Sequence, residues 1–184
     1  KIANARRPVI WAGGGVIKSG AANEIKELAE MIGAAVVTSQ AGKGSIPENH
    51  PQCIGYFTST EDVRDFIKKS DLFISVGTQF RSTETALWQS FLPEEHIGIN
   101  ANINSLNLNY NVTYGFVGDA KKVLRKIISQ LEGEDLQPNE QYIEEVKKVR
   151  STVRETLLDT LGPYKYFAKS IREILPDDAI FVRD

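Results

Sequence analysis

The stretch "RPVIWAGGGVIKSGA", residues 7–21, decides the fold class, because three glycines follow a short apolar run and precede a helical pattern. Pro8 to Ala12 predicts a buried strand. Ser19 is a suitable N-cap for a helix that ends at Gly33 and has one apolar face: Ile25, Leu28, Ala29 and Ile32. Strand, glycine turn and helix in this order favour a parallel sheet connected by helices.

The same alternation continues along the chain. Residues 35–39, "DLFISV" before Gly77, "EHIGIN" and "YGFVGD" each predict a strand. Thr60 and Asp119 are suitable N-caps for two further helices. The segments "QAGKGSIPENHPQCIGYF" and "TETALWQSFLP" are interpreted as a loop and as a loop or short helix. The sequence therefore predicts an α/β fold, a three-layer Rossmann-like domain with a mainly parallel sheet and helices on both faces.

Composition changes near Gly133, which indicates a division of the chain. Residues 1–132 are expected to form the first domain, and residues 133–162 a linker and a long amphipathic helix broken at "GP". Residues 163–184 predict one more helix and an apolar strand at Ala179 to Val182 without a partner strand. We interpret these parts as a C-terminal helical extension and a truncated strand that begins a second domain.

Composition also excludes several classes of protein. A net charge of −2 without a basic cluster excludes a nucleic-acid footprint, and no apolar window is long enough for a membrane span. One cysteine and two histidines provide neither a disulfide nor a zinc site, and Cys53, His50 and His96 are interpreted as structural. No catalytic or metal-ligating residues are predicted. A cytoplasmic location is expected.

The glycine turn allows two interpretations. Gly13 and Gly15 match the start of a G-x-G-x-x-G fingerprint, but Lys18 stands at its third glycine. No acidic residue follows the second predicted strand to hold a ribose, which disfavours an NAD-linked oxidoreductase. The glycines suit either close approach of a pyrophosphate or a tight turn alone. Gly77 ends a strand at the edge where α/β folds bind ligands.

Five segments in order resemble the middle domain of thiamine-diphosphate-dependent enzymes, most closely the acetolactate synthase branch. They are "RPVIWAGGGVIKSGA", "VVTSQAGKGSIPENHP", "IGYF", "SDLFISVGTQF" and "VGDAKKVLRKI". The resemblance implies a parent with three α/β domains, in which the other two hold thiamine diphosphate and Mg²⁺. Depending on the member, the middle domain holds FAD, ADP or no nucleotide.

The resemblance also implies which residues contact a nucleotide in the middle domain: Gly13, Gly14, Gly15, Thr38, Ser39, Gln40, Gly55, Tyr56, Gly77, Thr78, Asn100 and Asp119. Lys43 matches a lysine near the active-site entrance of the assembled enzyme. The sequence departs from the flavin pattern where synthases have G-x-R-F-D-D-R, with Gln79 at the first arginine. It also has Gly98 and Asn100 where they have the acids of I-D-I-D.

The resemblance therefore implies the central domain of a thiamine-diphosphate-dependent 2-oxo-acid carboligase of the acetolactate synthase type. Its expected partners are the remaining domains of the parent chain and further copies in a dimer or tetramer, with no nucleic acid and no membrane. The alternatives are a benzoylformate-decarboxylase-like central domain without nucleotide and a free-standing nucleotide-binding module. The missing catalytic domains imply that this segment alone catalyses nothing.

Overall fold

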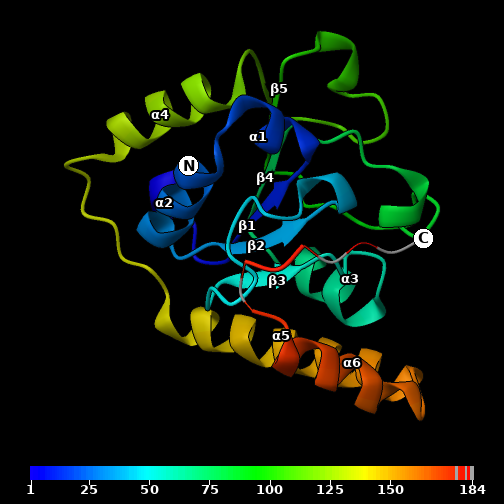
Figure 1. Ribbon diagram of the computed structural model, residues 1–184. Helices are drawn as coiled ribbons and strands as arrows, with labels where there is room; N and C mark the ends of the chain where they lie inside the picture. The colour runs from blue at the N-terminus through cyan, green and yellow to red at the C-terminus, as the bar shows by residue number, and fades with distance from the viewer. Residues whose placement is uncertain (177, 181, 183–184) are drawn as a thin grey trace.

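A computed structural model describes residues 1–176, 178–180 and 182. Its centre is a six-stranded sheet in which every neighbouring pair is parallel and the order is β3-β2-β1-β4-β5-β6 (Figure 1). This is the strand order of a dinucleotide-binding doubly wound fold, in which the order of strands along the sheet reverses between β1 and β4. The strands are β1 Pro8–Ala12, β2 Ala35–Thr38, β3 Cys53–Gly55, β4 Leu72–Val76, β5 His96–Asn100 and β6 Tyr114–Val117.

Helices cover both faces of the sheet, which confirms the predicted three-layer arrangement. One face packs against α1 (Gly14–Ser19), α2 (Ala22–Ile32) and α4 (Ala120–Leu131), and the other against α3 (Glu61–Lys68) and α5 (Glu140–Thr160). The last helix, α6 (Tyr164–Ile174), follows α5. Four short 3₁₀ turns complete the elements: η1 Ile2–Asn4, η2 Gln40–Gly42, η3 Ser82–Glu84 and η4 Ile103–Ser105.

Alternation along β1 explains how one short strand serves two cores. Ile10 and Ala12 belong to the core under α2 and α4, whereas Val9 and Trp11 belong to the core under α3 and α5. Successive side chains of a strand point to opposite faces, so a strand buried on both sides is apolar at every position. All five residues of β1 are buried, as the uninterrupted apolar run predicts.

Most predicted element ends agree with the structure. Gly33 ends α2 in the left-handed conformation with φ of 67°, and the Asp119 side chain accepts a hydrogen bond from the Lys122 N–H to cap α4. His96 is buried, and its Nε2 lies 2.8 Å from the Ser75 hydroxyl. Burial lowers the pKa of His96 to about 4. The ring is therefore neutral near pH 7, in agreement with a structural role.

Three local predictions were wrong or incomplete. Ser19 is the last residue of α1 rather than an N-cap, and its hydroxyl donates to the Gly15 and Val16 carbonyls. The chain turns into a helix directly after Gly13, and Gly20 ends that helix with φ of 63°. Strand β3 was predicted as loop, because its three residues are too few to show a period.

The predicted terminal strand at Ala179 to Val182 lies partly outside the described residues, because Phe181 is not among them. The other three positions are not in a strand. A strand needs a neighbour to pair its backbone groups, and the described part of the chain offers these residues none. Within that same part, none of the helices has the length and apolar character needed to cross a bilayer.

Candidate functional site

A cleft of about 400 Å³ lies at the carboxyl ends of the strands, at the point where strand order reverses between β1 and β4. It is formed by the segments that follow β1, β2, β4, β5 and β6. The lining residues are Gly14, Gly15, Lys18, Ser19, Ser39, Ala41, Gly77, Thr78, Gln79, Arg81, Glu84, Ile99, Asn100, Ala101, Asn102, Ser105, Asp119 and Ala120. Folds with this strand order bind their ligands in a crevice at this point.

The glycine turn forms one wall by packing backbone against backbone. The Gly13 N–H donates to the Val76 carbonyl at 2.8 Å, and the Gly15 N–H donates to the Gly77 carbonyl at 3.0 Å. A Cβ on Gly13 would lie 2.3 Å from the Gly77 oxygen, and one on Gly15 would lie 2.6 Å from the Gly77 Cα. Gly77 itself has φ of 60°. These three glycines are therefore required by the contact between the β1 and β4 loops.

This contact also decides which of the amides could reach an anion. Two of the three N–H groups of the triplet donate to backbone carbonyls, as described, and are not free for a phosphate. The Gly13 and Gly15 amides are therefore engaged in the close contact between the loops after β1 and β4. The cationic side chains that line the cleft are Lys18 and Arg81, and both are exposed.

Polar residues of the β5 and β6 loops shape the opposite wall. The Asn100 side chain donates to the Thr78 carbonyl at 3.0 Å and accepts from the Asn102 N–H at 3.0 Å. Asn100 thus ties the loop after β5 to the loop after β4. Asp119 lines the cleft while one of its oxygens caps α4.

The cleft also holds one buried carboxylate that the sequence did not identify. Glu84, the last residue of η3, is 3% exposed and lines the cleft. Its Oε1 accepts the Gln40 N–H at 3.2 Å. The segment "TETALW" carries no motif, so no signal in the sequence distinguishes the buried Glu84 from the glutamates on the surface.

The structure brings together seven of the twelve residues predicted for the site, which line the cleft: Gly14, Gly15, Ser39, Gly77, Thr78, Asn100 and Asp119. Gly13 contacts the backbone of Gly77, Thr38 ends β2 and Gln40 begins η2, and none of the three lines the cleft. Gly55 is the last residue of the outer strand β3 and Tyr56 follows it, and neither is among the lining residues. Lys43 is also absent from the lining and pairs with Glu48 at 3.5 Å.

Comparison with known proteins agrees with this geometry. Residues 1–127 match the family model described as thiamine pyrophosphate enzyme, central domain. The chain belongs to this family. The match contains all six strands, the loops that form the cleft and most of α4.

Individual relatives of this central domain extend the match. The chain is 36% identical over 163 residues to the "Probable acetolactate synthase large subunit" of Methanococcus aeolicus. The aligned region covers 82% of the chain and 27% of the relative. It is 32% identical over 192 residues to the "Acetolactate synthase" of Mycobacterium bovis, covering 98% and 31%. It is 35% identical over 134 residues to the "3D-(3,5/4)-trihydroxycyclohexane-1,2-dione hydrolase" of Bacillus cereus, covering 72% and 21%.

The chain spans about 30% of the length of the acetolactate synthases that it matches. The description of the family names thiamine pyrophosphate. Among the described residues, no three or more His, Cys, Asp or Glu side chains gather where a metal ion could bind.

Proposed function

We propose that this chain is the central domain of an acetolactate-synthase-like, thiamine-diphosphate-dependent carboligase, and that its cleft binds the adenosine diphosphate portion of a nucleotide. FAD and ADP both contain this portion. The observation that carries the proposal is the position of the cleft at the reversal of strand order, lined by loops from β1, β4 and β5.

The chemistry of the cleft supports a nucleotide over a purely apolar ligand. Its volume of about 400 Å³ falls within the range of about 300–1,000 Å³ that small-molecule sites occupy. Lys18 and Arg81 are the cations available to a phosphate, whereas Ser39, Thr78 and Asn100 supply neutral polar groups. Glycines at the wall allow a ligand to approach the backbone closely.

In the proposed parent, thiamine diphosphate supplies the carbanion chemistry when bound by other domains, together with Mg²⁺. This domain contributes nucleotide binding and structural support. We propose that residues 1–132 form the nucleotide-binding domain, 133–162 a linker and long helix, and 163–184 the start of a pyrophosphate-binding domain. In support, α6 buries no side chain among the described residues. The parent is proposed to assemble as a dimer or tetramer.

Ligand titration of the purified chain tests the nucleotide site. FAD, ADP, NAD and thiamine diphosphate are added separately while the melting temperature and flavin absorbance are followed. A ligand bound only by the folded state raises stability, by about 2.7 kcal/mol at 100 times its Kd. We expect stabilisation by ADP or FAD and none by thiamine diphosphate. Stabilisation by NAD alone, or by none of the four, would contradict the proposal.

A matched pair of variants tests whether the nucleotide binds in the cleft. Ala101 is exposed and lines the cleft, so Ala101→Trp fills the site without disturbing the core. Ala168→Trp makes the same change at an exposed position of α6. Binding should be lost in the first variant and retained in the second. Equal binding by both variants would show that the nucleotide binds elsewhere.

A further inference from the structure

Glu84 combines burial, charge and position in a way that a surface glutamate does not. Its residue is 3% exposed and forms part of the cleft wall. Oε1 accepts the Gln40 N–H, and within the described part of the chain no hydrogen bond engages Oε2. No lysine, arginine or histidine nitrogen of the described residues lies within 4.0 Å of the carboxylate.

A buried carboxylate without a cation is unfavourable unless polar donors replace the water that it loses. One backbone N–H replaces only part of that hydration. The free acceptor capacity of Glu84 lies at a cleft, so a bound molecule with hydroxyl groups would supply the missing donors. A phosphate would be repelled, because both groups are anionic. The carboxylate therefore favours the sugar portion of a ligand over its phosphates.

The position of Glu84 in the fold supports the same chemistry. Gln40, whose N–H it accepts, lies two residues beyond the end of β2. In doubly wound folds with this strand order, an acidic residue after the second strand accepts hydrogen bonds from ribose hydroxyls. Here β2 ends at Thr38 and continues into Ser39 and Gln40, with no acid. The loop that follows β4 delivers a carboxylate to that end of β2 instead.

Resting on the nucleotide site proposed above, we infer that Glu84 is its hydroxyl-recognition residue and accepts hydrogen bonds from neighbouring hydroxyls of the ligand's sugar portion. Two sources share this chemistry: the ribose of adenosine, and the ribityl chain present in FAD but not in ADP. Through Glu84, the site discriminates by the presence of hydroxyls rather than by the base.

The test compares wild type with Glu84→Gln, which keeps one oxygen for the Gln40 N–H, removes the charge and replaces the second acceptor oxygen with an NH2 donor. Binding of FAD, ADP and 2′,3′-dideoxy-ADP is measured by calorimetry. The matched control is Glu61→Gln, an exposed glutamate at the start of α3, away from the cleft. Melting temperatures without ligand verify that each variant folds. Because Glu84→Gln removes an unpaired buried charge, its melting temperature should equal or exceed that of wild type.

Hydrogen bonds to a charged group contribute more binding free energy than hydrogen bonds to a neutral one. We therefore expect Glu84→Gln to lower the affinity for the hydroxyl-bearing ligand by about 10- to 100-fold. If the ribose is the source, ADP weakens in the variant and 2′,3′-dideoxy-ADP binds both proteins equally. If the ribityl chain is the source, FAD weakens and ADP does not. Unchanged affinity for both FAD and ADP would overturn the inference and leave the nucleotide site standing. Absence of binding to wild type would overturn both.

Discussion

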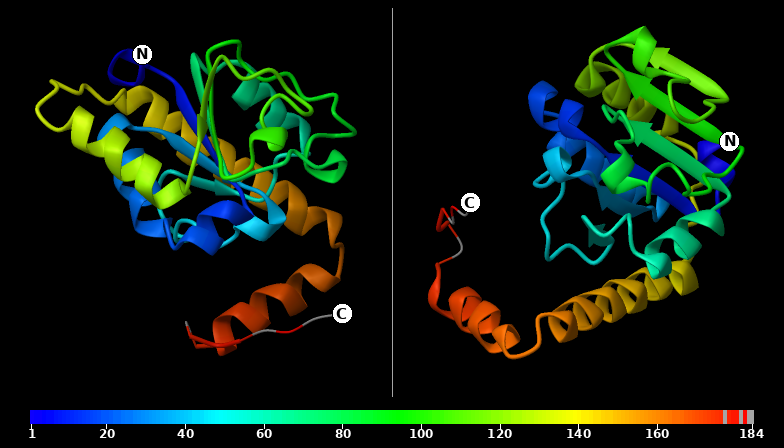
Figure 2. Two further views of the ribbon diagram at one scale, coloured as in Figure 1. Left: turned by 90° about the horizontal axis from the view of Figure 1, so that it is seen from above. Right: turned by 90° about the vertical axis from the view of Figure 1, so that its right-hand side faces the viewer.

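Helices α5 and α6 follow one another and both have an apolar face, yet only α5 contributes to a core. Tyr142, Val146 and Val153 of α5 are buried against the sheet. In α6, by contrast, Tyr164, Phe167 and Ile174 are 74%, 68% and 79% exposed. Both views in Figure 2 show α6 lying away from the sheet that α5 covers. An amphipathic pattern therefore predicts a helix but not the surface that it meets.

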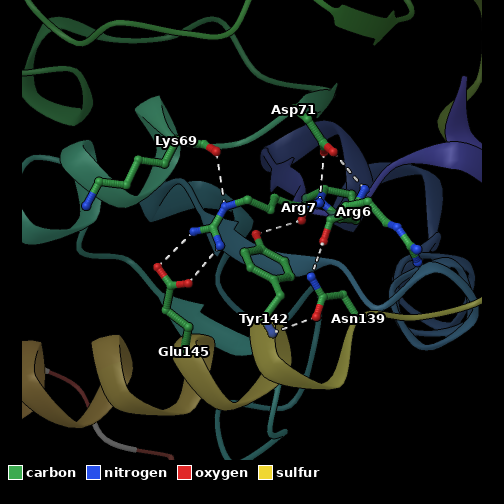
Figure 3. A network of polar contacts seen from close by, with 8 residues as sticks. Arg6, Arg7, Lys69, Asp71, Asn139, Tyr142 and Glu145 are labelled. Atoms are coloured by element: carbon green, nitrogen blue, oxygen red, sulfur yellow. Dashed lines mark hydrogen bonds and ion pairs between the residues drawn. The ribbon is translucent and has the colours of Figure 1, made fainter.

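A polar network fastens the first turns of α5 to the starts of β1 and β4 (Figure 3). The Arg7 guanidinium donates to both carboxylate oxygens of Glu145 at 2.8 Å and to the Lys69 carbonyl at 3.1 Å. Asp71 accepts the Arg6 and Arg7 N–H groups. This network connects segments more than 60 residues apart in sequence.

Tyr142 is the apolar centre of the same attachment. Its ring stacks on Phe66 with centroids 5.4 Å apart, and its hydroxyl donates to the Pro8 carbonyl at 3.0 Å. Burial raises the pKa of Tyr142, so the hydroxyl remains a neutral donor. Farther along α5, Arg150 and Arg154 donate to the His50 and Glu48 carbonyls at 2.9 Å. In the described residues, α6 has no comparable attachment to the sheet.

The largest expected effect comes from removing the Tyr142 ring. Tyr142→Ala leaves a cavity between α3 and α5 and should lower the free energy of unfolding by about 3–5 kcal/mol. Tyr166→Ala in α6, where the ring is 67% exposed, should change it by no more than about 0.5 kcal/mol. Urea unfolding measures both. Equal losses in the two variants would remove the distinction between the helices.

A smaller effect is expected from the ion pair at the edge of α5. The Glu145 and Arg7 side chains are 37% and 28% exposed, so solvent screens their interaction. Glu145→Gln should lower the free energy of unfolding by about 1 kcal/mol. The matched control is the neighbouring Glu144→Gln, which loses only an exposed pair with Lys147 and should cost less than about 0.5 kcal/mol.

The pH dependence of this difference tests its origin. The hydrogen bond from Arg7 lowers the pKa of Glu145 in the folded protein. Stabilisation is therefore fully present above the unfolded-state pKa of about 4.3 and is lost as pH falls through the lower folded value. The difference in unfolding free energy between wild type and Glu145→Gln should be constant near neutral pH and shrink below about pH 4.3. If the difference did not vary with pH, the stability lost in Glu145→Gln would come from packing rather than from the ion pair.

Repetitive local patterns account for what the sequence predicted. Apolar runs identified β1 and β4, and the i, i+3, i+4 spacing identified α2 and α5, because these patterns depend only on neighbouring residues. Strand β3 was not predicted, because it is three residues long and its register is set by pairing with β2. Ser19 was assigned to the wrong side of a helix boundary, because both Gly13 and Ala21 permit a helix to begin.

In the cleft, too, local sequence patterns predicted some residues and missed those that depend on contacts between distant segments. Gly77 and Thr78 were predictable, because they end an obvious strand at the sheet edge that binds ligands. The requirement for Gly13 and Gly15 comes from contact with Gly77, which is more than 60 residues away in sequence. Glu84 was not predictable, since its place beside Gln40 depends on the fold of a loop without a motif. Tertiary proximity, rather than local pattern, decides these residues.

The smallest expected effect on the free energy of unfolding comes from a substitution in α6. Phe167→Ser changes a side chain that is 68% exposed, so the free energy of unfolding should shift by no more than about 0.5 kcal/mol. An 11-residue helix without buried side chains is shorter than the ~12–15 residues that an isolated helix needs for even marginal stability in water. Native-state hydrogen exchange should therefore show α6 amides opening at a small fraction of the global free energy, while the buried turns of α5 open only with global unfolding. Protection of α6 equal to that of α5 would mean that α6 gains its stability from a surface other than this sheet.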